Sequence, residues 1–128
     1  MRALLDTHTF LWWITDDQRV SSRVRRILRN GSNEVFLSSV SGWEIIIKAQ
    51  LGRLKLADDP ARFIQEQIRL NSFQSLPVEM KHALHLFSLP THHKDPFDRM
   101  LIAQAQLEGL PILTADTQIG LYSVEVIW

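Results

Sequence analysis

Cysteine is absent from this 128-residue sequence, and several classes of site are excluded with it. Without cysteine there is no disulfide framework, no thiolate nucleophile and no zinc–thiolate centre. Long apolar runs are also missing, since none approaches the ~20 residues that a membrane-spanning helix needs. The first apolar run is interrupted by Asp6 and does not resemble a secretion signal. We therefore expect a cytoplasmic protein that has no contact with a membrane.

An excess of charge of one sign is missing as well, because 14 Lys and Arg balance 14 Asp and Glu. Binding to nucleic acid through bulk charge is not indicated, so any such binding needs a local basic cluster. The densest cluster lies on a predicted amphipathic helix over residues 20–30 and contains Arg23 and Arg26. A solvated helix face explains these arginines in the simplest way, but they are also our first candidates for contacts with a phosphate backbone.

What the sequence does contain is typical of one globular domain covering residues 1–128, with 45% apolar and 22% charged residues. Short apolar runs at residues 1–5, 34–37 and 112–114 predict buried strands. Helical patterns lie between them, including one that opens at Asp95-Pro96. Alternating strands and helices predict an α/β fold with a central, mostly parallel sheet that is covered on both faces.

Four acidic residues are predicted to meet at one edge of this sheet. Asp6 and Asp116 follow two of the predicted strands, and parallel strands end at the same edge. Glu44 is the last residue of a Ser-x-x-Glu capping box beginning at Ser41, and Asp98 lies in the first turn after Asp95-Pro96. Helix openings face that same edge, so we expect the four carboxylates to converge.

Two interpretations of these acids remain open. Acidic residues favour helix N-termini, so capping explains each of them singly. A metal site explains all four together, because a divalent cation offsets the repulsion between neighbouring carboxylates. Carboxylate oxygens suit Mg²⁺ or Mn²⁺, and two such ions can activate water and stabilise the leaving oxygen of a phosphodiester.

Basic residues near the predicted helix opening are the remaining candidates. His92, His93 and Lys94 form a loop that we expect to lie near phosphate rather than to bind a metal. Arg99 directly follows Asp98 and would either contact phosphate or pair with an acid.

Four segments of the sequence resemble the motifs of PIN domains, most closely those of VapC-type toxins. They occur in order along the whole chain: residues 4–8, residues 38–44, residues 95–105 and residues 113–116. The resemblance implies a three-layer αβα sandwich and an Mg²⁺- or Mn²⁺-dependent ribonuclease. It also implies a homodimer and a cognate antitoxin protein that inhibits the enzyme by occupying its groove.

The resemblance also assigns residues by position. The four family acids correspond to Asp6, Glu44, Asp98 and Asp116. The small polar positions that support them correspond to Thr7, Ser38 and Thr114. Asp95 is an extra acid, which we interpret first as a helix cap and second as a neighbour of the metal. Thr117 and Gln118 follow Asp116 in place of the further acidic or Asn residues usual in the family, so this fourth ligand is expected to be weak or to act through water.

An alternative function stays open at this point. The same fold, with its acids retained only as helix caps, would be a non-catalytic interaction module that binds a partner protein. A haloacid-type phosphatase is disfavoured, because His8 stands where that family has a second aspartate.

Overall fold

A five-stranded parallel sheet forms the centre of the computed structural model, which describes all residues from 1 to 128. The strand order is β3-β2-β1-β4-β5, and every neighbouring pair is parallel. The strands are β1 (Arg2–Leu5), β2 (Glu34–Ser38), β3 (Gln74–Leu76), β4 (Ile112–Leu113) and β5 (Val126–Ile127). The helices are α1 (Thr7–Ile14), α2 (Ser22–Arg29), α3 (Ser39–Gln50), α4 (Pro60–Leu70), α5 (Met80–His85) and α6 (Pro96–Glu108), with 3₁₀ turns η1 (Leu86–Ser88) and η2 (Ile119–Leu121).

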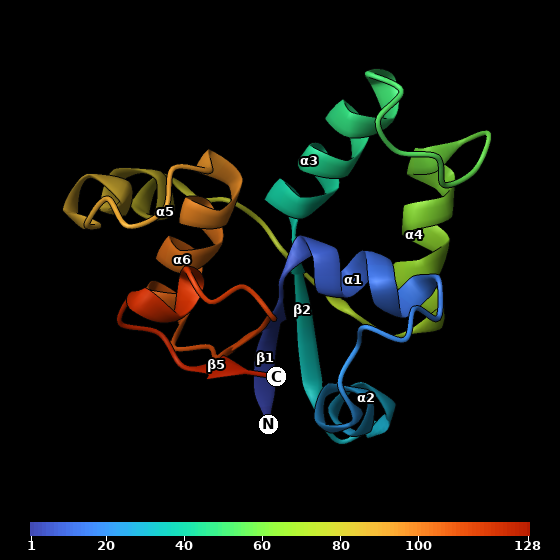
Figure 1. The fold of residues 1–128 in the computed structure, drawn as a ribbon, viewed down its shortest axis with the longest axis horizontal. Helices are drawn as coiled ribbons and strands as arrows, with labels where there is room; N and C mark the ends of the chain where they lie inside the picture. The colour runs from blue at the N-terminus through green and yellow to red at the C-terminus, as the bar shows by residue number, and fades with distance from the viewer.

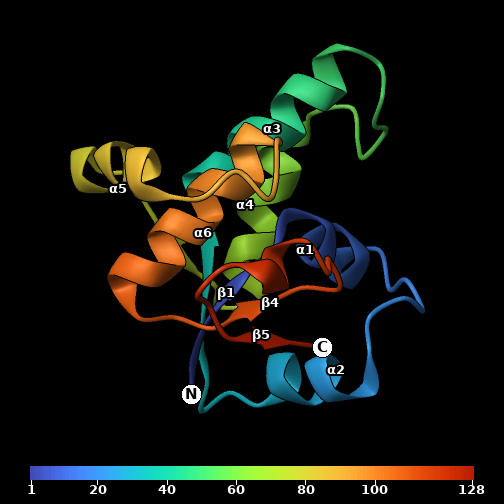
Figure 2. The ribbon, with the colours of Figure 1, turned by 60° about the vertical axis from the view of Figure 1, so that its left-hand side comes forward.

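Helices cover both faces of the sheet, which confirms the predicted αβα layers. Ala3 and Leu5 of β1 belong to a core shared with α1, α2, α3 and α4. Leu4 points to the other face and belongs to a second core built mainly on α6. Figures 1 and 2 show α6 and α1 on opposite sides of the strands. Since side chains alternate between the two faces of a strand, burial on both faces explains why these strands are apolar without alternation.

The predicted strands at residues 1–5, 34–37 and 112–114 are confirmed. The opening of α6 is confirmed too: the Asp95 side chain accepts hydrogen bonds from the backbone N–H of Phe97 (2.8 Å) and of Asp98 (3.4 Å). The helix ends at Gly109, whose φ of 67° is a left-handed conformation that glycine adopts without strain.

The predicted capping box at Ser41 and Glu44 is wrong. Helix α3 begins at Ser39, directly after β2, and its N-cap is Ser38, whose hydroxyl accepts from the backbone N–H of Val40 at 3.1 Å. Ser41 instead accepts a hydrogen bond from the Thr7 hydroxyl at 2.8 Å. Glu44 therefore lies inside the helix, where capping does not explain it.

The apolar residues of the short helix α5 contribute little to the core. Met80 and Leu84 are 72% and 69% exposed, and Phe87 in η1 is 99% exposed. The buried residue of α5 is His82. None of the helices combines the length and hydropathy that crossing a bilayer requires.

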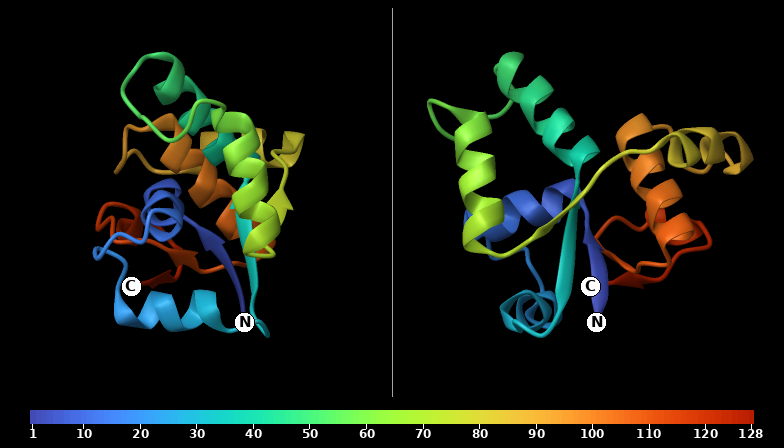
Figure 3. Two further views of the ribbon diagram at one scale, coloured as in Figure 1. Left: turned by 90° about the vertical axis from the view of Figure 1, so that its right-hand side faces the viewer. Right: turned by 180° about the vertical axis from the view of Figure 1, so that it is seen from behind.

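The N-terminus lies near α2, at the edge of the sheet where β1 and β2 begin, whereas the C-terminus follows β5, whose Ile127 is level with Leu113 at the end of the parallel strand β4 (Figure 3). The opposite edge, where these strands end, is surrounded by the first turns of α1, α3 and α6. This arrangement leaves the carboxyl edge of the sheet as the place where residues from several elements meet.

Candidate active site

The four predicted acids come from four elements that meet at the carboxyl edge. Asp6 follows β1 and precedes α1, Glu44 lies in α3, Asp98 lies in the first turn of α6, and Asp116 follows β4. Asp6, Glu44 and Asp98 are 4%, 2% and 7% exposed, and Asp116 is half-buried. Three carboxyl groups are thus withdrawn almost completely from water, which is unusual for acids that serve only as surface helix caps.

The electrostatics of the site show that these acids act on one another. Burial raises the pKa of Asp98 to about 7, and the negative charges of Asp6, Asp95 and Glu44 add to this increase. Burial also raises the pKa of Asp6, where the charges of Asp116 and Glu44 act in the same direction. The fold therefore brings all four predicted acids within electrostatic reach of one another.

Asp6 and Glu44 each have one oxygen held by a hydrogen-bond donor, and Asp98 has one oxygen in close contact with a histidine nitrogen. The Thr114 hydroxyl donates to Asp6 Oδ2 at 2.8 Å, Lys48 Nζ to Glu44 Oε2 at 2.6 Å, and His93 Nε2 lies 2.9 Å from Asp98 Oδ2. The remaining oxygens of Asp6 (Oδ1) and Glu44 (Oε1) are buried and have no hydrogen-bond partner.

Buried polar atoms without partners are costly, so native structures contain few of them. Two such oxygens on neighbouring carboxylates fit a divalent cation, which prefers hard oxygen ligands and would offset the charge that raises the pKa values here. The donors on the other oxygens are typical of residues that orient metal-binding carboxylates. The donor set of the site thus fits a divalent metal ion.

The predicted supporting residues divide into two groups. Thr114 contacts the acids directly, because its hydroxyl donates to Asp6 and also accepts from the backbone N–H of Asp116 at 3.0 Å. Thr7 and Ser38 make their hydrogen bonds elsewhere: Thr7 joins α1 to α3, and Ser38 caps α3. Asp95 caps α6, and its charge contributes to the raised pKa of Asp98.

The four basic candidates are dispersed over the molecule. Arg23 and Arg26 are exposed on α2, beside the amino ends of β1 and β2 and away from the acids (Figure 1). The Arg99 guanidinium donates to the carbonyl oxygens of Pro90 (2.7 Å) and Leu86 (3.3 Å), so it neither pairs with an acid nor points to solvent. Lys94 is exposed and lies in the loop that leads into α6.

Two contacts to the acids were not predicted from the sequence: one comes from Lys48, and the other from His93, which was expected near phosphate. Lys48 lies four residues after Glu44, a helix spacing at which Glu and Lys side chains meet, so its pairing could have been found. His93 lies 2.9 Å from Asp98 Oδ2 and 3.1 Å from Asp116 Oδ2, so it contacts the acids of the site. No local pattern predicts this contact, because Asp116 lies 23 residues further along the chain.

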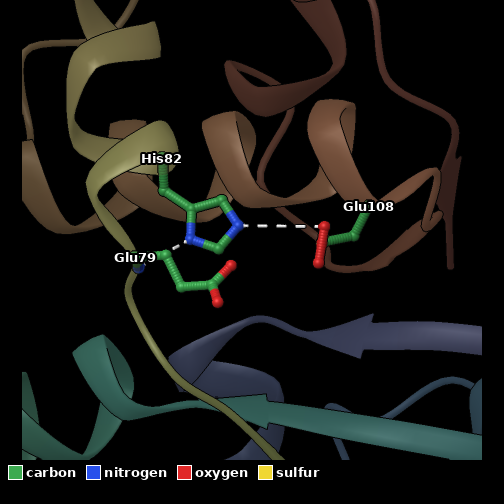
Figure 4. A group of neighbouring side chains, drawn as sticks. All are labelled: Glu79, His82 and Glu108. Atoms are coloured by element: carbon green, nitrogen blue, oxygen red, sulfur yellow. Dashed lines mark hydrogen bonds and ion pairs between the residues drawn. The ribbon is translucent and has the colours of Figure 1, made fainter.

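A second histidine, His82 of α5, lies outside this site, between Glu79, the N-cap of α5, and Glu108 of α6 (Figure 4). The backbone N–H of Glu79 donates to His82 Nδ1 at 2.9 Å, so the neutral ring carries its proton on Nε2, which faces Glu108 at 3.9 Å. A protonated nitrogen is not a metal ligand, and the Lys81 ammonium already lies 3.1 Å from Glu108 and 3.7 Å from Glu79. This cluster therefore ties α5 to α6 and is not a metal site.

Known proteins match the chain over nearly its whole length. Ribonuclease VapC22 of Mycobacterium tuberculosis is 25% identical over 118 residues, which cover 91% of this chain and 88% of the relative. Among solved structures, DNA-bound VapBC from Salmonella typhimurium has a TM-score of 0.70 at 20% identity, covering 99% and 97% of the two chains. FitAcB from Neisseria gonorrhoeae has a TM-score of 0.64 at 21% identity, covering 100% and 97%. The PIN domain family itself matches residues 3–125, and the chain therefore belongs to that family.

Proposed function

We propose that this chain is an endoribonuclease, dependent on Mg²⁺ or Mn²⁺, that hydrolyses phosphodiester bonds of RNA. The observation that carries the proposal is the pair of buried, unpartnered oxygens on Asp6 and Glu44, next to the equally buried Asp98. Two relatives, VapC22 and VapC16 of Mycobacterium tuberculosis, are ribonucleases by name, and VapC16 is 30% identical over half of this chain.

In this proposal, Asp6, Glu44 and Asp98 hold the divalent ion, and Asp116 supports it from the open side of the site. When bound, the ion activates water and stabilises the charge that develops on the phosphate. The protein itself supplies orientation: Thr114, Lys48 and His93 each hold one carboxylate oxygen, so the acids stay in place without rearranging during the reaction. Lys94 is exposed beside the site and is our candidate for a contact with the RNA backbone.

We further propose that the enzyme is the toxin of a toxin–antitoxin pair and acts in the cytoplasm as a homodimer. Its partner in this proposal is a cognate antitoxin protein. The support is that a Klebsiella pneumoniae toxin–antitoxin complex and VapBC-5 of Mycobacterium tuberculosis have the same fold.

The proposal is tested by incubating purified protein with total cellular RNA in Mg²⁺, in Mn²⁺ and in EDTA. Asp98→Asn is purified in parallel, and Asp58→Asn, at an exposed acid in the loop before α4, is the matched control. We expect cleavage by the wild type and Asp58→Asn in either metal, none in EDTA, and at least a 100-fold loss in Asp98→Asn. Cleavage that persists in EDTA or in Asp98→Asn would refute the proposal.

The alternative is a PIN-fold interaction module without catalysis. It predicts that the folded wild type cleaves no RNA in either metal and binds no Mn²⁺. Calorimetric titration with Mn²⁺ alone separates the two functions, because it does not require the correct RNA target.

A further inference from the structure

His93 occupies the space between two of the site acids. Its ring nitrogen Nε2 lies 2.9 Å from Asp98 Oδ2 and 3.1 Å from Asp116 Oδ2, and its side chain is 11% exposed. The two carboxylates come from different elements, α6 and the segment after β4. His93 is thus the side chain that joins Asp116 to the more deeply buried acids.

The other ring nitrogen determines the chemistry of this contact. The backbone N–H of Asp95 donates to His93 Nδ1 at 3.2 Å, so Nδ1 is an acceptor and the neutral ring carries its proton on Nε2. Nε2 is therefore a donor to Asp116 Oδ2, and Asp98 Oδ2 lies 2.9 Å from the same nitrogen. To bind a metal ion it would have to lose this proton while Nδ1 still faced an N–H group, which makes His93 unsuited to be a ligand.

Hydrogen bonds also hold the backbone of His93 in place. Its N–H donates to the hydroxyl of the buried Tyr122 at 2.8 Å. Arg99 donates to that same hydroxyl at 3.2 Å and to the carbonyl oxygen of His93 at 3.5 Å. Arg99 and Tyr122 thereby fix the loop that presents the imidazole, which accounts for the guanidinium of Arg99 pointing inward.

We propose that His93 is a positioning residue that sets the separation of Asp98 and Asp116 and so prepares the site for a divalent cation. Its Nε2 donates to Asp116 Oδ2 and lies against Asp98 Oδ2, which leaves Oδ1 of Asp98 for the ion. Asp116 Oδ1 accepts from the backbone N–H of Gln118 at 2.9 Å, so both Asp116 oxygens are already engaged. Asp116 therefore acts on the ion without being one of its direct ligands. This inference rests on the metal site proposed above.

The test measures Mn²⁺ affinity by calorimetry, without RNA, in the wild type and four variants. We expect His93→Ala to bind Mn²⁺ about 10-fold or more weakly, the range found when such supporting partners are removed. His93→Gln, whose side-chain NH₂ keeps a donor, restores affinity to within about 3-fold of the wild type. His92→Ala is the matched control with unchanged affinity, because its ring contacts Tyr122 and no acid.

Asp98→Asn separates the two proposals. If Asp98→Asn loses Mn²⁺ binding and His93→Ala does not, only the positioning inference fails. If Asp98→Asn binds Mn²⁺ as the wild type does, the metal site fails and the inference fails with it. Should His93→Ala not fold, as judged by circular dichroism, His93→Phe keeps the ring volume without the donor and replaces it.

Electron paramagnetic resonance of the bound Mn²⁺ gives a second readout that a purely structural effect would not change. We expect no nitrogen coupling from a histidine ligand in either the wild type or His93→Gln. Nitrogen coupling that is present in the wild type and lost in His93→Gln would make His93 a ligand and overturn the inference.

Discussion

At the scale of one residue, the buried carboxyl group of Asp98 lowers the stability of the folded protein when it is charged. Its carboxyl group is 7% exposed, lies near the charges of Asp6, Asp95 and Glu44, and has a pKa raised by burial to about 7. His93 lowers the pKa of Asp98 and so offsets part of this cost. A folded protein that binds the Asp98 proton more tightly than the unfolded chain must lose stability as this proton leaves.

The first prediction concerns the stability of the metal-free protein. Because burial raises the pKa of Asp98 to about 7, the contribution of Asp98 is fully favourable below about pH 4 and is lost as the pH rises through about 7; the raised pKa of Asp6 acts in the same direction. In EDTA, the free energy of unfolding of the wild type should therefore fall between pH 4.5 and pH 7.5. In Asp98→Asn it should fall by at least about 1 kcal/mol less. Urea titrations at both pH values measure this; equal losses in wild type and variant would contradict it.

At the scale of elements, the acids are placed by where helices begin. Helix α3 follows β2 without a loop, so Ser38 ends the strand and caps the helix, and Glu44 turns inward. Helix α6 begins at the Asp95 cap, which puts Asp98 in its first turn. At its other end, Gly109 in a left-handed conformation stops α6 and turns the chain toward β4, which carries Asp116 beyond its end.

The second prediction tests that turn. Gly109→Ala should lower the free energy of unfolding by about 1 kcal/mol, because an L-residue is strained at a φ of 67°. No atom lies within 4 Å of the added Cβ, so the cost is conformational and not a clash. Gly31→Ala is the matched control: it also has open space, its φ is not in the left-handed region, and we expect a change within about 0.5 kcal/mol. Similar losses in both variants would contradict the explanation.

At the scale of the whole molecule, the two ends of the sheet differ in what they can do. The acids lie at the carboxyl edge, and the exposed Lys94 lies in the loop that leads into α6, next to them in the chain. Arg23 and Arg26 are on α2, which lies near the start of β1 (Figure 2). Because the chain has no net charge, its overall charge does not attract RNA. A basic residue should matter to RNA binding only where it lies near the site.

The third prediction compares these basic residues. Lys94→Ala should raise the KM for RNA several-fold with little change in kcat, and should lower the slope of log affinity against log salt by about 0.7, the value for one phosphate of a single strand. The double variant Arg23→Ala, Arg26→Ala should change neither quantity. Binding measured by fluorescence anisotropy over a range of salt concentrations tests both. A larger effect of the double variant would show that RNA contacts α2.

Much of the site could be predicted because its acids occupy recognisable local positions. Asp6 directly follows an apolar strand, and Asp98 lies just inside a helix marked by Asp95-Pro96. Glu44 was predicted to line the site although its expected capping box was wrong, since the side chain faces the same edge from inside α3. The contacts of His93 and Arg99 could not be predicted, because their partners lie on other elements or are backbone carbonyls of a loop.

The sequence by itself determined the layers of this protein and the edge at which its acids gather. Apolar strands alternating with helices must be buried on both faces, and parallel strands must end on one side. Only the tertiary structure decided which oxygen of each acid is held, by Thr114, Lys48 or His93, and which is left buried without a partner. The physical reason is that local periodicity records burial, whereas a hydrogen bond between distant residues depends on distances that only the packed fold defines.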